Sequence, residues 1–117
     1  MIENFEFGRL VVIGDLLLDQ YVFGTVERIS PEAPVPVLRK ARQSAVPGGA
    51  ANVAVNAAAL GCAVSLIGVV GADENAQTLR NALAAWPGIT VHGLVEEPGW
   101  ATISKMRVVS GHQQIVR

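Results

Sequence analysis

The sequence contains a single cysteine, so no internal disulfide is available to it. Cys62 lies between Gly61 and Ala63 in an apolar run, and this setting is typical of a small buried thiol rather than of a nucleophile. His92 and His112 have no acidic, cysteine or second histidine residue at the spacing of metal ligands. The sequence therefore predicts no structural metal.

Charge is also scarce, at 16% of residues, and the net charge is −1 with no basic block. A nucleic-acid partner is therefore not expected. Residues 45–72 carry no formal charge, a length that could span a membrane, but proline, glycine and asparagine interrupt them. The N-terminal residues include acidic side chains and no long apolar stretch, so they do not resemble a signal peptide. We expect a cytoplasmic protein with no membrane partner.

Half of the residues are hydrophobic, which is enough to form the core of one domain in a chain of 117 residues. Short β-branched runs alternate with two segments of helical pattern, which predicts an α/β fold with a largely parallel sheet. The expected strands of this part are 9–15, 63–71 and 89–95, and the expected helices are 48–61 and 73–86. The first of these strands is a short β-branched run closed by a glycine, typical of a strand buried on both faces, and the second is predicted as a second buried strand.

A second segment departs from this alternation. Residues 20–29 have the pattern of a half-exposed strand, and residues 31–40 contain three prolines, which suit an edge strand or an extended arm. We expect a small β lid over about residues 20–44, beside the sheet edge where open α/β sheets bind ligands. Residues 102–110 and 112–117 are predicted as two further strands, joined by a hairpin at Ser110–Gly111.

Polar residues follow the first predicted strand and open the first predicted helix. Asp15 and Asp19 could accept hydrogen bonds from sugar hydroxyls, although a turn cap and a solvated carboxylate are the alternatives. Gly48 and Gly49 could present backbone N–H groups to a ligand, with Asn52 one turn later. Tight packing of a helix on a sheet would require the same glycines. Neither G-x-G-x-x-G nor a P-loop motif occurs, so nucleotide binding of those two types is not supported.

Two cations alternate near the end of the chain. Lys105 and Arg107 would share one face of a strand, where they could hold a phosphate or a carboxylate. A solvated strand face explains the same pattern equally well.

Four stretches resemble the N-terminal part of the heptose 7-phosphate kinases, which belong to the ribokinase-like (PfkB) carbohydrate kinases. They are GDLLLDQYVFGTVERISPEAPVPVL, PGGAANVAVNAAALG, VSLIGVVGADE and TISKMRVVSGHQQIVR. The Gly-Gly/Asn helix start is shared by the wider superfamily, whereas RISPEAPVPV and the final K-x-R…Q-Q…R are narrower. The resemblance covers residues 10–117. One departure is Ala76, where the family usually has glycine.

The resemblance implies roles for these residues. Asp19, with Asp15 as its weaker neighbour, would bind sugar hydroxyls, together with the backbone of Gly48 and Gly49 and the side chain of Asn52. Lys105 and Arg107 would hold the phosphate that the substrate already carries. Gln113, Gln114 and Arg117 also match, without an assigned role. The β lid implies a homodimer in which the lid strands of two subunits clasp.

The implied reaction is ATP-dependent phosphorylation of D-glycero-D-manno-heptose 7-phosphate at its anomeric hydroxyl, with Mg²⁺, for ADP-heptose and lipopolysaccharide core synthesis. The family's catalytic aspartate, in a Gly-Ala-Gly-Asp loop, and its nucleotide pocket come later than the residues present here. We therefore expect an N-terminal piece of a kinase, inactive alone, with no catalytic or cofactor-binding residue of its own. The alternatives are another sugar kinase of this family or a non-catalytic sugar-binding or dimerisation module, and a Rossmann oxidoreductase is more distant.

Overall fold

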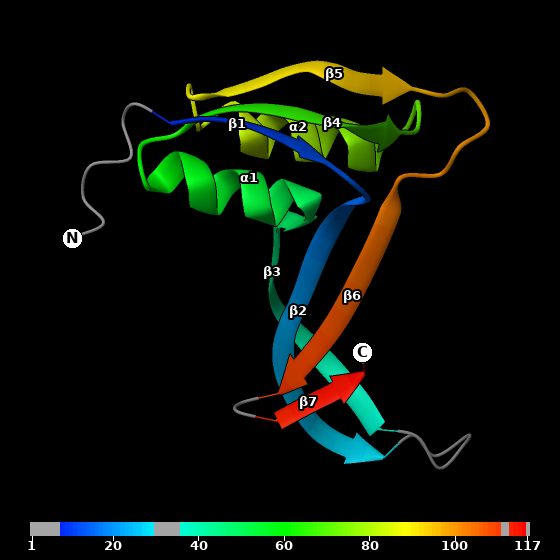
Figure 1. Ribbon diagram of the computed structural model, residues 1–117. Coiled ribbons are helices and arrows are strands. Elements are labelled where there is room, and N and C mark those ends of the chain that lie inside the picture. Colours follow the sequence, from blue (N-terminus) through cyan, green and yellow to red (C-terminus); the bar gives the residue numbers. More distant parts are fainter. Residues whose placement is uncertain (1–7, 30–35, 111–112, 117) are drawn as a thin grey trace. The chain divides into compact units, whose positions relative to one another are not determined.

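The computed structural model describes residues 8–29, 36–110 and 113–116, and side chains between 8 and 110 outside 26–41. The described elements alternate as the sequence predicts for an α/β protein (Figure 1). The strands are β1 (Arg9–Ile13), β2 (Leu16–Ile29), β3 (Pro36–Gly49), β4 (Ala63–Val70), β5 (Ile89–Glu96), β6 (Ile103–Ser110) and β7 (Gln113–Val116). The helices are α1 (Ala50–Ala59) and α2 (Glu74–Leu83).

The chain divides into two compact units. The first consists of residues 1–18 and 46–104, and the second of residues 19–45 and 105–117. The second unit contains the segment 20–44 that the sequence suggests as a lid, and it also takes in the end of the chain. That this segment acts as a lid stays a prediction.

The first unit is a parallel sheet with both helices on one face. Its strand order is β1-β4-β5, and β4 pairs in parallel with each neighbour. Figure 1 shows α1 and α2 on the same side of this sheet. The apolar residues of β4 and of the helices pack together there, with Leu66 and Leu79 fully buried. The predicted parallel sheet and helices are confirmed.

The prediction that β1 and β4 are buried on both faces is wrong. Val11 and Ile13 of β1 are 61% and 72% exposed, and alternate residues of β4 are exposed as well. The cause is that both helices cover the same face, so among the described residues the opposite face has no covering layer. Cys62, expected to be buried, is only half-buried.

The second sheet has the strand order β3-β2-β6-β7. Strands β6 and β7 are antiparallel, and Ser110 pairs with Gln113, so the predicted hairpin is confirmed. Strand β2 is longer than expected, because it begins at Leu16, directly after the turn that follows β1. β3 is the edge strand that the prolines suggested.

No helix in the described part of the chain is long and apolar enough to cross a membrane.

Candidate functional site

The candidate residues are divided between the two units. Asp15, Gly48, Gly49 and Asn52 belong to the first unit, and Asp19, Lys105 and Arg107 belong to the second. The side chains of Gln113, Gln114 and Arg117, and of His112, lie outside the described residues.

In the first unit, the turn after β1 meets the start of α1. The Ala50 N–H donates a hydrogen bond of 2.8 Å to the carbonyl oxygen of Asp15. Gly49 precedes the helix with φ 58° and ψ −132°, a conformation that only glycine adopts without strain. Helix α1 has no side-chain cap and no acidic residue in its first turn. The carboxylate of Asp15 and the side chain of Asn52 are exposed.

A cavity of about 390 Å³ adjoins the same turn. Its walls come from the apolar residues of β1, β4 and β5 and from Trp100, and Asp15 is the one charged residue that lines it. Trp100 itself is 47% exposed. Asp15 therefore borders a largely apolar hollow, whereas sugar binding requires several polar partners.

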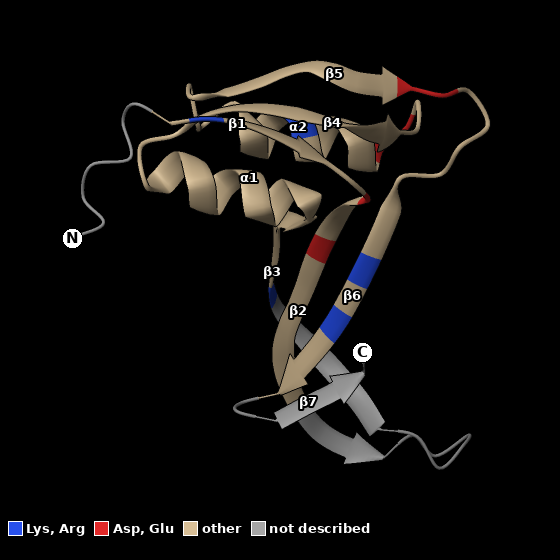
Figure 2. Ribbon diagram, in the orientation of Figure 1, with Lys and Arg blue, Asp and Glu red and all other residues tan. Residues whose placement is uncertain are grey.

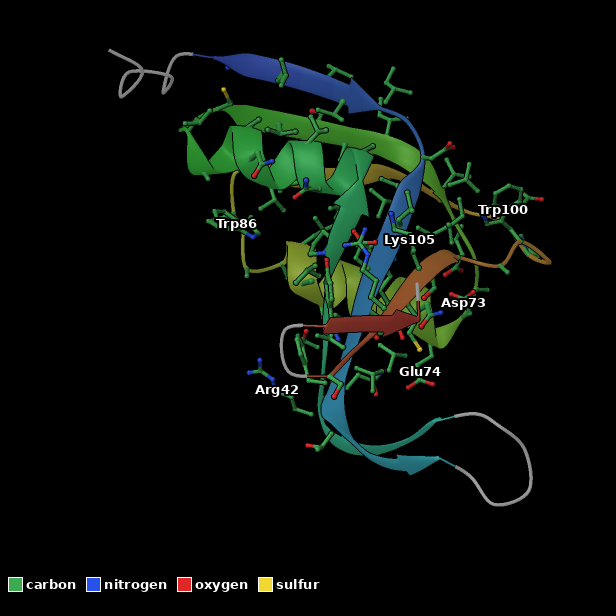
Figure 3. All side chains as sticks on the ribbon, turned by 90° about the horizontal axis from the view of Figure 1, so that it is seen from below. Arg42, Asp73, Glu74, Trp86, Trp100 and Lys105 are labelled. Atoms are coloured by element: carbon green, nitrogen blue, oxygen red, sulfur yellow. The ribbon has the colours of Figure 1, made fainter. Side chains whose placement is uncertain are left out.

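In the second unit, acidic and basic residues lie on neighbouring strands. Asp19 is on β2, and Lys105 and Arg107 are on β6, which is adjacent to β2 in the sheet (Figure 2). Met106 between the two cations is 44% exposed, whereas Lys105 and Arg107 are half-buried, as expected for residues that share the opposite face. Figure 3 labels Lys105 among the side chains of this strand.

Two polar atoms of this group are buried and have no hydrogen-bond partner within the part of the chain that the structure describes. They are Oδ1 of Asp19 and Nε of Arg107, so these two atoms are not bonded to each other. A buried polar group without a partner costs about 1–3 kcal/mol. An ordered water, an ion or a ligand can complete such a group.

A cluster that the sequence does not predict precedes β6. The Thr102 hydroxyl donates to Oδ1 of Asp73 at 2.6 Å, and the Thr102 N–H donates to Oδ2 at 2.9 Å. The same hydroxyl accepts a hydrogen bond of 2.8 Å from the buried N–H of Gly71. Asp73 also caps α2, since its Oδ1 accepts from the Ala76 N–H at 2.9 Å. Figure 3 shows Asp73 at the start of this helix.

These contacts favour the ionised form of Asp73. They also hold the backbone that precedes β6 in place. Hydrogen bonds from the side chain and the backbone of Thr102, and from the Ala76 backbone, hold the pKa of Asp73 below its ordinary value of 3.8. Thr102 directly precedes the strand that carries Lys105 and Arg107. The sequence indicates that Asp73 begins a helix, but it does not indicate that Thr102, 29 residues later, is bonded to Asp73.

Thr102→Val is expected to lower the free energy of unfolding by about 1–3 kcal/mol, because it leaves the buried Gly71 N–H without an acceptor. Urea denaturation measures this loss. Thr102→Ser is the matched control, since it keeps the hydroxyl and removes only a methyl group, at a cost of about 0.8 kcal/mol. Equal losses in the two variants would mean that the hydroxyl contributes nothing.

Sequence comparisons identify the family. The model of the pfkB family of carbohydrate kinases matches residues 8–117. The chain is 62% identical over its full length to the bifunctional protein HldE of Gluconobacter oxydans, and 54% identical to that of Azorhizobium caulinodans. In both comparisons it spans about a quarter (24%) of the length of the relative.

The fold is also that of a solved ribokinase. The structure of Arabidopsis thaliana ribokinase, complexed with ribose and ATP, matches 92% of this chain and 34% of its own length with a TM-score of 0.69. The sequence identity is 18%, so this likeness concerns the ribokinase-like α/β fold alone. The family match over residues 8–117 decides the assignment: the chain belongs to the pfkB family of carbohydrate kinases.

Proposed function

We propose that the protein containing this chain is a kinase that transfers the terminal phosphoryl group of ATP to the anomeric hydroxyl of D-glycero-D-manno-heptose 7-phosphate. The product would be the 1,7-bisphosphate, for ADP-heptose and lipopolysaccharide core synthesis in the cytoplasm. The 62% identity to a bifunctional HldE protein supports this choice within the family. The observation that carries it is the pair of buried, unpartnered atoms on β2 and β6, an acceptor on Asp19 and a donor on Arg107.

The chemistry of these side chains suits a phosphorylated sugar. The carboxylate of Asp19 accepts hydrogen bonds from vicinal hydroxyls, with the exposed Asp15 as a weaker neighbour. Lys105 and Arg107 offer two cations to one phosphate. The backbone at Gly48 and Gly49 and the side chain of Asn52 would bind further hydroxyls. These residues bind and orient the substrate, which is the larger part of what phosphoryl transfer requires of a protein.

The catalytic base and the nucleotide site are not assigned to residues of this chain. In the described part of the chain no group of three or more histidine, cysteine, aspartate or glutamate side chains could hold a metal ion. No step of the reaction is assigned to Mg²⁺ in these residues. The lid strands of two subunits would join them as a homodimer.

The proposal is tested with the protein expressed from its complete gene. Release of ADP is measured with heptose 7-phosphate, with ribose and with fructose as acceptors. A kcat/KM at least about 100-fold higher for the phosphorylated heptose supports the proposal. Preference for another phosphosugar would identify a different kinase of the same family. Binding of heptose 7-phosphate by calorimetry, without any turnover, would instead identify a sugar-binding module.

Replacing Lys105 and Arg107 together by alanine is expected to weaken binding of heptose 7-phosphate by about 10- to 100-fold, because the phosphate loses its charge-assisted hydrogen bonds. Calorimetry at constant ionic strength measures the dissociation constant. Arg80→Ala in α2 is the control, since it removes one cation in the other unit. An affinity within about twofold of the unsubstituted protein would favour a sugar without a phosphate at this position.

A further inference from the structure

Two aromatic rings and two arginines form a row across three neighbouring strands of the second unit. The rings of Tyr21 and Phe23 on β2 are stacked, with centroids 6.1 Å apart and an angle of 19° between their planes. Arg42 of β3 places its Cζ 4.2 Å from the Phe23 centroid, and Arg107 of β6 places its Cζ 5.7 Å from the Tyr21 centroid. Each cation is attracted to the face of its ring, so Tyr21 is held by a stacked ring and a cation.

The Tyr21 hydroxyl also fixes the direction of the Arg107 guanidinium. Nη1 of Arg107 donates a hydrogen bond of 3.0 Å to this hydroxyl. A guanidinium is planar, and its five N–H groups point in fixed directions. Once Nη1 is bonded to Tyr21, the direction of Nε is therefore set. Nε is buried and has no hydrogen-bond partner among the described residues, so its N–H is a donor that an oxyanion would satisfy.

Asp19 on the neighbouring strand supplies a hydrogen-bond acceptor to accompany the donor on Arg107. It lies two residues before Tyr21 on β2, so both side chains are on one face of the sheet. Its Oδ1 is buried and lacks a donor, just as Nε of Arg107 lacks an acceptor. A ligand with a hydroxyl and an oxyanion would satisfy both atoms, and a sugar phosphate has both groups.

We propose that Tyr21 is a positioning residue that makes the site selective for phosphorylated sugars, because its hydroxyl fixes the orientation of the Arg107 guanidinium that would bind the phosphate. This inference rests on the proposed function and adds to it the residue that orients the phosphate-binding cation. If the hydroxyl only stabilised the β sheet, its removal would affect phosphorylated and unphosphorylated sugars alike.

Tyr21→Phe tests this, since it removes the hydroxyl and keeps the stacked ring. In the protein expressed from its complete gene, we expect the KM for heptose 7-phosphate to rise about 5- to 10-fold, as for the loss of one hydrogen bond. The kcat is expected to stay within about twofold, because the change affects binding at a distance from the reacting hydroxyl. The KM for the unphosphorylated heptose should also stay within about twofold. An equal rise for both sugars would overturn the inference.

A double-mutant cycle shows whether Tyr21 acts through Arg107. In an Arg107→Ala background, Tyr21→Phe is expected to have no further effect on the KM for the phosphorylated sugar. Additive effects of the two substitutions would overturn the inference. Phe23→Leu is the comparison for general weakening of the sheet, since it disturbs the stacking and leaves the hydroxyl in place.

Measuring the binding of inorganic phosphate tests the role of Tyr21 independently of the proposed kinase activity. Calorimetry with phosphate requires no turnover, so it can be done even if the protein does not phosphorylate heptose 7-phosphate. Weaker phosphate binding by Tyr21→Phe, by about 5-fold, supports the positioning role whichever sugar phosphate is the substrate. Unchanged phosphate binding overturns it, even in a protein that is an active heptose kinase.

Discussion

Replacement of Gly49 by alanine is expected to lower the free energy of unfolding by about 2–6 kcal/mol. The backbone strain of an L-residue at φ 58°, ψ −132° accounts for about 1–3 kcal/mol. A Cβ at this position would also overlap Leu17 and the carbonyl oxygen of Asp15, and such overpacking costs about 1–3 kcal/mol more. A typical domain has only about 5–15 kcal/mol of stability, so a large part of it would be lost.

Gly99→Ala separates the two causes. Gly99 also has a positive φ, of 84°, but no atom lies within 4 Å of the position that a Cβ would occupy. Its replacement should therefore cost about 1–2 kcal/mol, from backbone strain alone. Urea denaturation of both variants gives the comparison. If Gly49→Ala were no more destabilising than Gly99→Ala, the close approach of the β1–β2 turn to the start of α1 would be wrong.

The alternation of strands and helices was predictable because each element carries its own local signal. The glycines before α1 and after it, and Asp73 before α2, are end signals that need no knowledge of the rest of the fold. Alternation at Lys105 and Arg107 likewise predicted a shared strand face, and their half-buried side chains agree with it. These inferences depend on neighbours within a few residues, which the sequence displays directly.

The burial of β1 and β4 was mispredicted for a physical reason. An apolar strand reveals that its side chains can be buried, but not which faces are covered. Both α1 and α2 lie on one side of the first sheet, so Val11, Ile13 and Val69 are exposed on the other. Which face of a sheet is covered depends on the side to which the connecting helices pass. The residues of a single strand do not reveal that side.

Contacts between distant residues were beyond local patterns altogether. Asp73 was recognised only as the first residue of a helix, whereas it also accepts two hydrogen bonds from Thr102. Residues 20–29 show only the pattern of a half-exposed strand, whereas the Tyr21 hydroxyl in this segment accepts a hydrogen bond from Arg107, 86 positions away. Neither pairing has a spacing rule, because the sheet order brings the residues together.

Asp19→Asn is the substitution for which we expect the largest loss of activity, about 100- to 1000-fold in kcat/KM for the sugar. Its buried, unpartnered Oδ1 is proposed to accept hydrogen bonds from the substrate's hydroxyls. Hydrogen bonds to a charged group contribute about 1.5–3 kcal/mol each, and every 1.4 kcal/mol is a factor of ten. Asparagine has nearly the same shape, so the loss would reflect charge and acceptor capacity rather than packing.

Asp15→Asn provides the graded comparison, because the exposed Asp15 has the same chemistry without the buried oxygen. We expect it to lower kcat/KM by about tenfold or less. Thermal unfolding of Asp19→Asn should show a transition close to that of the unsubstituted protein, since asparagine has nearly the same shape as aspartate. A fall in kcat/KM that is equal for the two variants would contradict the assignment of Asp19 as the principal sugar ligand. The buried acceptor on β2 would then serve the sheet rather than the substrate.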